Sequence, residues 1–195
     1  MYSTKVTERN LLRAEEIIKK QHDLPMRWNL NISSKGEREE MHAHFETLLD
    51  PKGFLIRDVT REESLWILKE CTVAKLDFHY FSNNYGTIID WTSRPTLVEF
   101  NIAQKLILAL IAEYEELGYA LMFLFLKARR LGITTLWQLL LAHRVFFYRN
   151  VGAYTGSAEQ TKSREMVQMI EMIWEYLPWW MKPRMTTYRA GELMK

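Results

Sequence analysis

The feature that most constrains the fold is a short apolar run at residues 119–126 (YALMFLFL), which lies between Gly118 and Lys127. Hydrophobic spacing alone does not distinguish a strand from a helix in so short a run. Its bounded length and the polar residues that follow it favour a strand buried on both faces, as in a parallel sheet. The run is far shorter than the roughly 20 apolar residues that a membrane span needs.

The segments on either side extend this pattern. Helical spacing predicts a helix over residues 101–117 that stops at Gly118, then a helix over 134–148, a short strand at 151–155 and a helix over 158–176 that ends before Pro178. The order strand, loop, helix, strand, helix is typical of an α/β domain with a parallel sheet. We expect this domain over residues 76–195.

Residues 1–75 are predicted to form a preceding helical region. Helices are expected over 5–20 and 37–49, and a third is expected to begin at Thr60, which has capping-box spacing to Glu63. Residues 77–95 are rich in aromatic and turn-forming side chains, which indicates a packed connector.

The junction KARRLGITT at residues 127–135 joins the predicted strand to the next helix. A phosphate site needs backbone N–H groups at a helix N-terminus, a glycine that lets the chain come close, a nearby cation and a hydroxyl for Mg²⁺. Gly132 and Thr134 supply the glycine and the hydroxyl, and Lys127, Arg129 and Arg130 supply positive charge. The usual pattern of a phosphate-binding loop has glycine where Lys127 stands and lysine where Ile133 stands, so an ordinary strand-to-helix turn is the competing interpretation.

The run LKARRLGITTLWQ resembles the deviant Walker A segment of the large terminase subunits of tailed phages, in which the lysine is displaced to the start of the loop. Upstream, VEFNIAQKLIL is similar to that family's adenine-recognition segment, with Gln104 at the position of the glutamine that reads the base. The resemblance covers roughly residues 70–195. It implies a P-loop ATPase fold, with ATP and Mg²⁺ as cofactors.

The resemblance also implies a role for each residue of the loop. Lys127 and Arg129 would act on the triphosphate during catalysis, either of them reaching the γ-phosphate, and Thr134 would ligate the Mg²⁺ bound with ATP. The implied nucleotide-binding set is Gln104, Lys127, Arg129, Arg130, Leu131, Gly132, Ile133, Thr134 and Thr135.

The family's Walker B strand, which ends in Asp-Glu, and its C-terminal nuclease domain have no counterpart in the 195 residues. We therefore expect the front part of the motor, either a fragment or one part of a split protein, with hydrolysis in the full-length protein and little by this chain alone. The implied partners are double-stranded DNA, the portal protein, the small terminase subunit and further copies in a ring, in the bacterial host cytoplasm and without a membrane.

The composition of the chain does not decide between the possible functions. The net charge of +2 does not favour DNA binding by bulk charge. One cysteine, Cys71, excludes an internal disulfide and fits a reducing compartment. We interpret His42 and His44 as solvated helix residues, and Cys71 as a buried thiol.

Core packing is expected of the pair Trp179 and Trp180. The alternatives to a terminase are a non-catalytic α/β module that binds a protein or nucleic acid, or part of a P-loop helicase.

Overall fold

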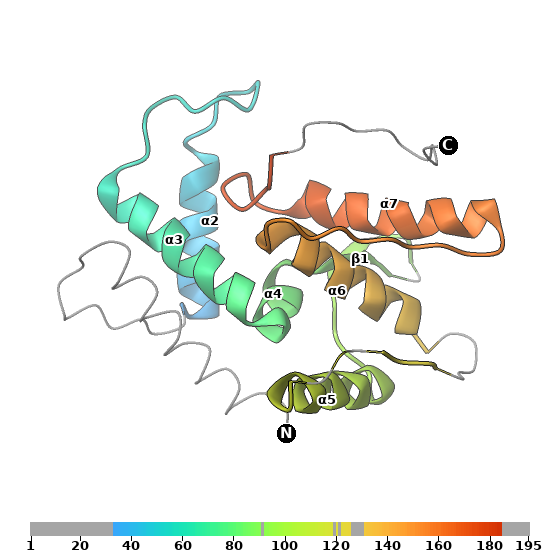
Figure 1. Ribbon diagram of the computed structural model, residues 1–195. Helices are drawn as coiled ribbons and strands as arrows, with labels where there is room; N and C mark the ends of the chain where they lie inside the picture. The colour runs from blue at the N-terminus through green and yellow to red at the C-terminus, as the bar shows by residue number, and fades with distance from the viewer. Residues whose placement is uncertain (1–32, 91, 119, 121, 126–130, 185–195) are drawn as a thin grey trace.

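The computed structural model describes residues 33–90, 92–118, 120, 122–125 and 131–184. This part of the chain is mixed α/β and mostly helical (Figure 1). Its elements are α2 (Lys35–Glu46), α3 (Arg61–Leu76), α4 (Phe78–Tyr85), β1 (Thr87–Ile89), β2 (Pro95–Leu97), α5 (Ile102–Glu116), α6 (Ile133–Phe147) and α7 (Gln160–Tyr176).

Local capping explains where several helices begin. Thr60 and Glu63 form the predicted capping box at the start of α3, in which each side chain accepts a hydrogen bond from the other residue's backbone N–H. Ser34 caps α2 in a similar way by accepting from the N–H of Glu37. The helix expected before Gly118 is confirmed as α5, and Gly118 follows it with a φ of +70°.

The aromatic connector at residues 77–95 folds into more structure than expected. Asp77 caps the short helix α4 by accepting from the N–H of Tyr80. Strands β1 and β2 then pair as an antiparallel hairpin, with Ile88 opposite Thr96. The hairpin is the only sheet in the described part of the chain.

Two strands expected from the sequence are not formed by the described residues. Residues 120 and 122–125 are irregular, and so are residues 151–157. A parallel P-loop sheet is therefore not seen in this part of the chain. The physical reason is that a strand forms through hydrogen bonds to a neighbour, and no described segment pairs with either run.

Aromatic and aliphatic side chains from α3, α4, α6 and α7 share one core. Phe81, Leu136, Leu139 and Ile173 are almost fully buried in it. Val73 and Ala74 of α3 belong to the same core, although they precede the domain boundary expected at residues 75–76. That boundary stays a prediction.

A second cluster anchors the segment after α7. Trp179 and Trp180 pack against Phe45 of α2, and Trp180 also contacts Trp66 of α3 edge to face. The Trp179 indole N–H donates to the backbone carbonyl of Phe45 at 3.4 Å. Core packing, as the sequence predicted, accounts for the tryptophan pair.

Helices α6 and α7 lie side by side, and α7 also packs against β1 (Figure 1). Helix α5 contacts α6 near the start of that helix. None of the described helices is both long and apolar enough to cross a membrane.

Candidate functional site

The start of α6 has the geometry of an open helix N-terminus. Gly132 occupies the N-cap position with a φ of +68°, a left-handed conformation that glycine adopts without strain. No described side chain caps the helix, so the first-turn N–H groups of Ile133, Thr134 and Thr135 keep no side-chain acceptor from this part of the chain. Such N–H groups and the helix dipole favour an anion at this end.

Gln104 from α5 lies directly on this turn. Its side-chain Nε2 donates to the backbone carbonyl of Gly132 at 2.8 Å, across 28 residues of sequence. Asn101 adds a parallel bridge, because its Nδ2 donates to the backbone carbonyl of Leu131 at 3.1 Å. The structure thus brings together the two segments that the sequence singled out separately.

Gly132 packs closely against the side chain of Gln104. A Cβ added at Gly132 would lie 2.8 Å from Nε2 of Gln104 and 3.5 Å from Nδ2 of Asn101. The first distance is shorter than any normal carbon–nitrogen contact. The left-handed backbone therefore favours glycine at this position, and a Cβ there would have to displace the end of the Gln104 side chain.

Asn101 was not among the residues predicted for the site. Its side chain accepts from the N–H of Gln104, and the Gln104 side chain accepts in return from the N–H of Asn101 at 3.0 Å. This capping box has the spacing N-x-x-Q, so the signal was present in the sequence. Gln104 is only 4% exposed, whereas glutamine side chains are mostly exposed in proteins.

Lys127, Arg129 and Arg130 lie outside the described residues, so their predicted contacts with a triphosphate stay predictions. Leu131 and Thr134 are described, the first exposed and the second half-buried. Ile133 is buried, which means that it can contribute only its backbone N–H to a ligand.

A cavity of about 250 Å³ opens beside the first turn of α6. Thr135 forms part of its wall, opposite residues of β1 and α7. The remaining lining residues are Ile88, Ile89, Glu165, Gln168, Met169 and Met172. The cavity therefore has apolar walls and a few polar groups next to a predicted phosphate site, which is the usual make-up of a ligand pocket.

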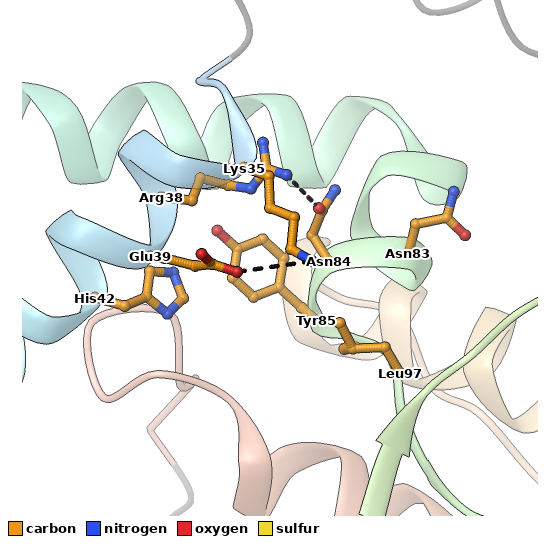
Figure 2. Close-up of a pocket in the computed structure, with 8 residues that line it drawn as sticks. All are labelled: Lys35, Arg38, Glu39, His42, Asn83, Asn84, Tyr85 and Leu97. Carbon is orange, nitrogen blue, oxygen red and sulfur yellow. Dashed lines mark hydrogen bonds and ion pairs between the residues drawn. The ribbon is translucent and has the colours of Figure 1, made fainter.

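A larger cavity of about 410 Å³ lies elsewhere, between α2, α4 and β2 (Figure 2). Arg38 is already engaged there, since it donates to Asn84 at 2.7 Å and to the backbone carbonyl of Ser33. The exposed pair of Lys35 and Glu39 is separated by 3.8 Å (Figure 2). Because the cations have protein partners, this cavity shows no preference for a ligand class.

Other polar candidates have structural roles. Burial raises the pKa of the Cys71 thiol to about 12, so Cys71 is no nucleophile at neutral pH. His44 and Arg57 both bind the carboxylate of Glu63, at 2.6 Å and 2.7 Å, and these hydrogen bonds lower the pKa of Glu63. Among the described residues, no group of His, Cys, Asp or Glu is arranged to hold a metal ion.

Comparison of the chain with protein-family models, with curated proteins and with solved structures gives no significant match.

Proposed function

We propose that this chain is the ATP-binding part of a phage DNA-packaging motor, the large terminase subunit. The observation that carries the proposal is the contact of Gln104 with Gly132 at 2.8 Å. Two segments that resemble functional motifs of one family meet at the start of one helix.

The first turn of α6 supplies the phosphate contacts in this proposal. The N–H groups of Ile133, Thr134 and Thr135 point along the helix axis, where the positive end of the dipole stabilises an anion. Lys127 and Arg129 add the cationic charge that offsets the charge of the triphosphate during phosphoryl transfer, and Arg130 assists in binding. The Thr134 hydroxyl holds Mg²⁺ bound with the nucleotide.

The sheet of the motor is a further part of the proposal. Along residues 122–125 exposed and half-buried side chains alternate: Met122 and Leu124 are 86% and 100% exposed, whereas Phe123 and Phe125 pack on Trp137. An alternation of period two is typical of a strand. This run would then be one strand of a larger parallel sheet, which other parts of the full-length protein would complete.

In the full-length protein, the motor would couple ATP hydrolysis to the movement of double-stranded DNA into the procapsid. It would act as a ring on the portal protein and receive DNA with the small terminase subunit. Its DNA contacts would be mainly to phosphates, because the motor moves along any sequence.

Calorimetric titration with Mg²⁺ and a non-hydrolysable ATP analogue tests the proposal. We expect binding that weakens at least about tenfold, or about 1.4 kcal/mol, in Thr134→Ala, and much less in Thr134→Ser, which keeps the hydroxyl. Lys127→Ala and Arg129→Ala should each weaken binding in a longer form of the protein. Arg149→Ala, at the other end of α6, is the matched control and should bind normally.

Unchanged binding in the Thr134, Lys127 and Arg129 variants would contradict the proposed phosphate contacts. No binding of the analogue by the unmodified chain or by the longer form would reject ATP as its ligand.

One observation favours the alternative of a non-catalytic interaction module. Met122 and Leu124 stand two residues apart and are 86% and 100% exposed, and apolar side chains exposed close together are typical of contact surfaces. Such a module would bind its partner without nucleotide, so the same titration separates the two functions.

A further inference from the structure

Helix α5 has an inner and an outer face of different exposure. Its buried residues, Gln104, Leu108 and Ile111, form the inner face, from which Gln104 bonds to the start of α6. On the outer face four large apolar side chains are exposed: Ile102, Leu106, Leu110 and Leu117. Water therefore contacts apolar surface that a helix of a monomeric protein usually buries.

The exposed side chains form one continuous stripe, which we call the α5 stripe. Ile102, Leu106 and Leu110 follow one another at intervals of four residues, so they lie one above the other on the helix. Leu117 continues the stripe about two turns further on. Helix α5 lies at the lower edge of the molecule in Figure 1, where another molecule can reach this face. A contiguous exposed apolar surface of this kind is typical of an interaction site.

The charges next to the α5 stripe have opposite signs in its two halves. Lys105 is exposed in the first half of α5, and Glu113 is exposed in the second half, about 12 Å further along the helix axis. Neither side chain forms an ion pair within the described part of the chain. Glu115, by contrast, already binds Arg144 of α6. A complementary partner therefore carries an acidic group opposite Lys105 and a basic group opposite Glu113.

The same helix from a second copy of the chain, turned antiparallel, meets both requirements. Lys105 and Glu113 are each four residues from Ala109, so a two-fold axis at Ala109 places Lys105 of each copy opposite Glu113 of the other. Ala109 is exposed, and its small side chain lets two helix axes come close at the crossing point. A parallel pair would instead place like charges together.

We propose that two copies of the chain associate through their α5 stripes, antiparallel about Ala109, with Lys105 of each copy paired to Glu113 of the other. This contact goes beyond the proposed function and needs no nucleotide. It leaves the start of α6 accessible, because Gln104 lies on the opposite face of α5. Since the same surface is used by both copies, the contact is distinct from the head-to-tail contacts of a ring.

Sedimentation velocity of the full chain at about 0.1 mM and low salt tests the proposal, because ion pairs at a surface are screened as salt rises. We expect a dimer. Lys105→Glu and Glu113→Lys should each weaken it at least about tenfold, because like charges then face each other twice. An equimolar mixture of the two variants should restore the dimer as a heterodimer, in which both pairs again have opposite charges.

A second comparison tests the apolar part of the contact. Leu106→Glu should also weaken the dimer at least about tenfold, because it places a carboxylate in the centre of the α5 stripe. Ile56→Glu is the matched control and should leave the dimer unchanged. Ile56 is 63% exposed and Leu106 67%, and Ile56 lies in the loop between α2 and α3, far from α5 in Figure 1. Circular dichroism should show the same helical content in all variants, since each replaced side chain is exposed.

A monomeric unmodified chain at this concentration would overturn the inference. So would a dimer that persists in Leu106→Glu, or a mixture of the two charge variants that stays monomeric. If the unmodified chain is monomeric and Leu106→Glu lowers its thermal stability, another segment of the same chain covers the stripe, and the inference is wrong. ATP binding is measured separately, so a failure of this contact is distinguishable from a failure of the proposed function.

Discussion

At the scale of single residues, two glycines have the same backbone conformation but different surroundings, and only one of them lies against a described side chain of another helix. Gly118 and Gly132 both have a left-handed backbone, with φ values of +70° and +68°. No atom of the described residues lies within 4 Å of a Cβ added at Gly118, whereas Gln104 would lie 2.8 Å from one at Gly132. Replacing each glycine by alanine therefore distinguishes the free-energy cost of backbone strain from the cost of steric overlap with Gln104.

We expect Gly118→Ala to lower the free energy of unfolding by about 1 kcal/mol, from the strained backbone alone. Gly132→Ala should cost about 1–3 kcal/mol more, because the added methyl group displaces Gln104 from the carbonyl of Gly132. Urea denaturation of both variants gives the comparison. Equal losses in the two variants would mean that Gln104 moves aside without cost.

A second prediction concerns the buried carboxylate of Glu70, which is 1% exposed. It accepts hydrogen bonds from the hydroxyls of Tyr85, at 2.7 Å, and Tyr80. Tyr85→Phe removes one of these bonds and should destabilise the fold by about 1.5–3 kcal/mol, the usual range for a bond to a charged group. Tyr154→Phe makes the same chemical change at a side chain that is 96% exposed, and thermal unfolding should show almost no effect.

At the scale of elements, the joint between α5 and α6 determines the shape of the candidate site. Asn101 caps α5 with its side-chain oxygen, and its side-chain nitrogen reaches Leu131 just before α6. The side-chain oxygen of Gln104 accepts from the N–H of Asn101, and its side-chain nitrogen donates to the carbonyl of Gly132. The beginning of α6 is thus held by the beginning of α5, through two side chains that also stabilise α5 itself.

Asn101→Ser should separate these two roles. Serine can still cap α5, but its shorter side chain cannot reach the carbonyl of Leu131. We expect a loss of only a few tenths of a kcal/mol in stability, with faster hydrogen exchange over residues 131–136. Asn101→Ala should lose the cap as well and cost about 1 kcal/mol. Unchanged exchange in the serine variant would show that the bridge to Leu131 does not hold the loop.

At the scale of the whole molecule, buried histidines make stability depend on pH. His143 lies in the core between Phe78, Phe81 and Phe147, and its Nε2 donates to the backbone carbonyl of Ala74 at 2.9 Å. Burial lowers its pKa from 6.5 to about 4. His42 and His79 are half-buried, and this partial burial lowers their pKa values as well. The interpretation of His42 as a solvated helix residue was therefore wrong, because its ring packs against Tyr85 and Trp180. In each case the folded protein prefers the neutral imidazole.

The sign of the effect follows from the protons bound in each state. Between pH 6.5 and about 4 the unfolded chain binds a proton at His143 and the folded chain does not. Stability should therefore fall as the pH drops through this window, by up to about 3 kcal/mol for His143. Denaturation midpoints at pH 7 and pH 4.5 measure it. His143→Gln should be less stable at pH 7 but lose less on acidification, and an unchanged slope would contradict the assignment.

The sequence alone determined where several of the helices begin or end. The capping box at Thr60 and Glu63 and the stop at Gly118 were predicted correctly, because these signals act between residues at most four apart. The helix after the loop was likewise placed within one residue of α6. The packing of Trp179 and Trp180 against other aromatic side chains was also predicted, since large aromatic side chains gain most from burial.

Only the tertiary structure decided what depends on distant partners. The runs at residues 119–126 and 151–155 read as strands, yet their described residues form none, because a strand needs a neighbour that spacing cannot supply. The contact of Gln104 with Gly132 and the cavity beside Thr135 join segments from separate elements. Caps and turns are local interactions and can be read from the order of residues, whereas sheets, cavities and sites arise from packing between elements.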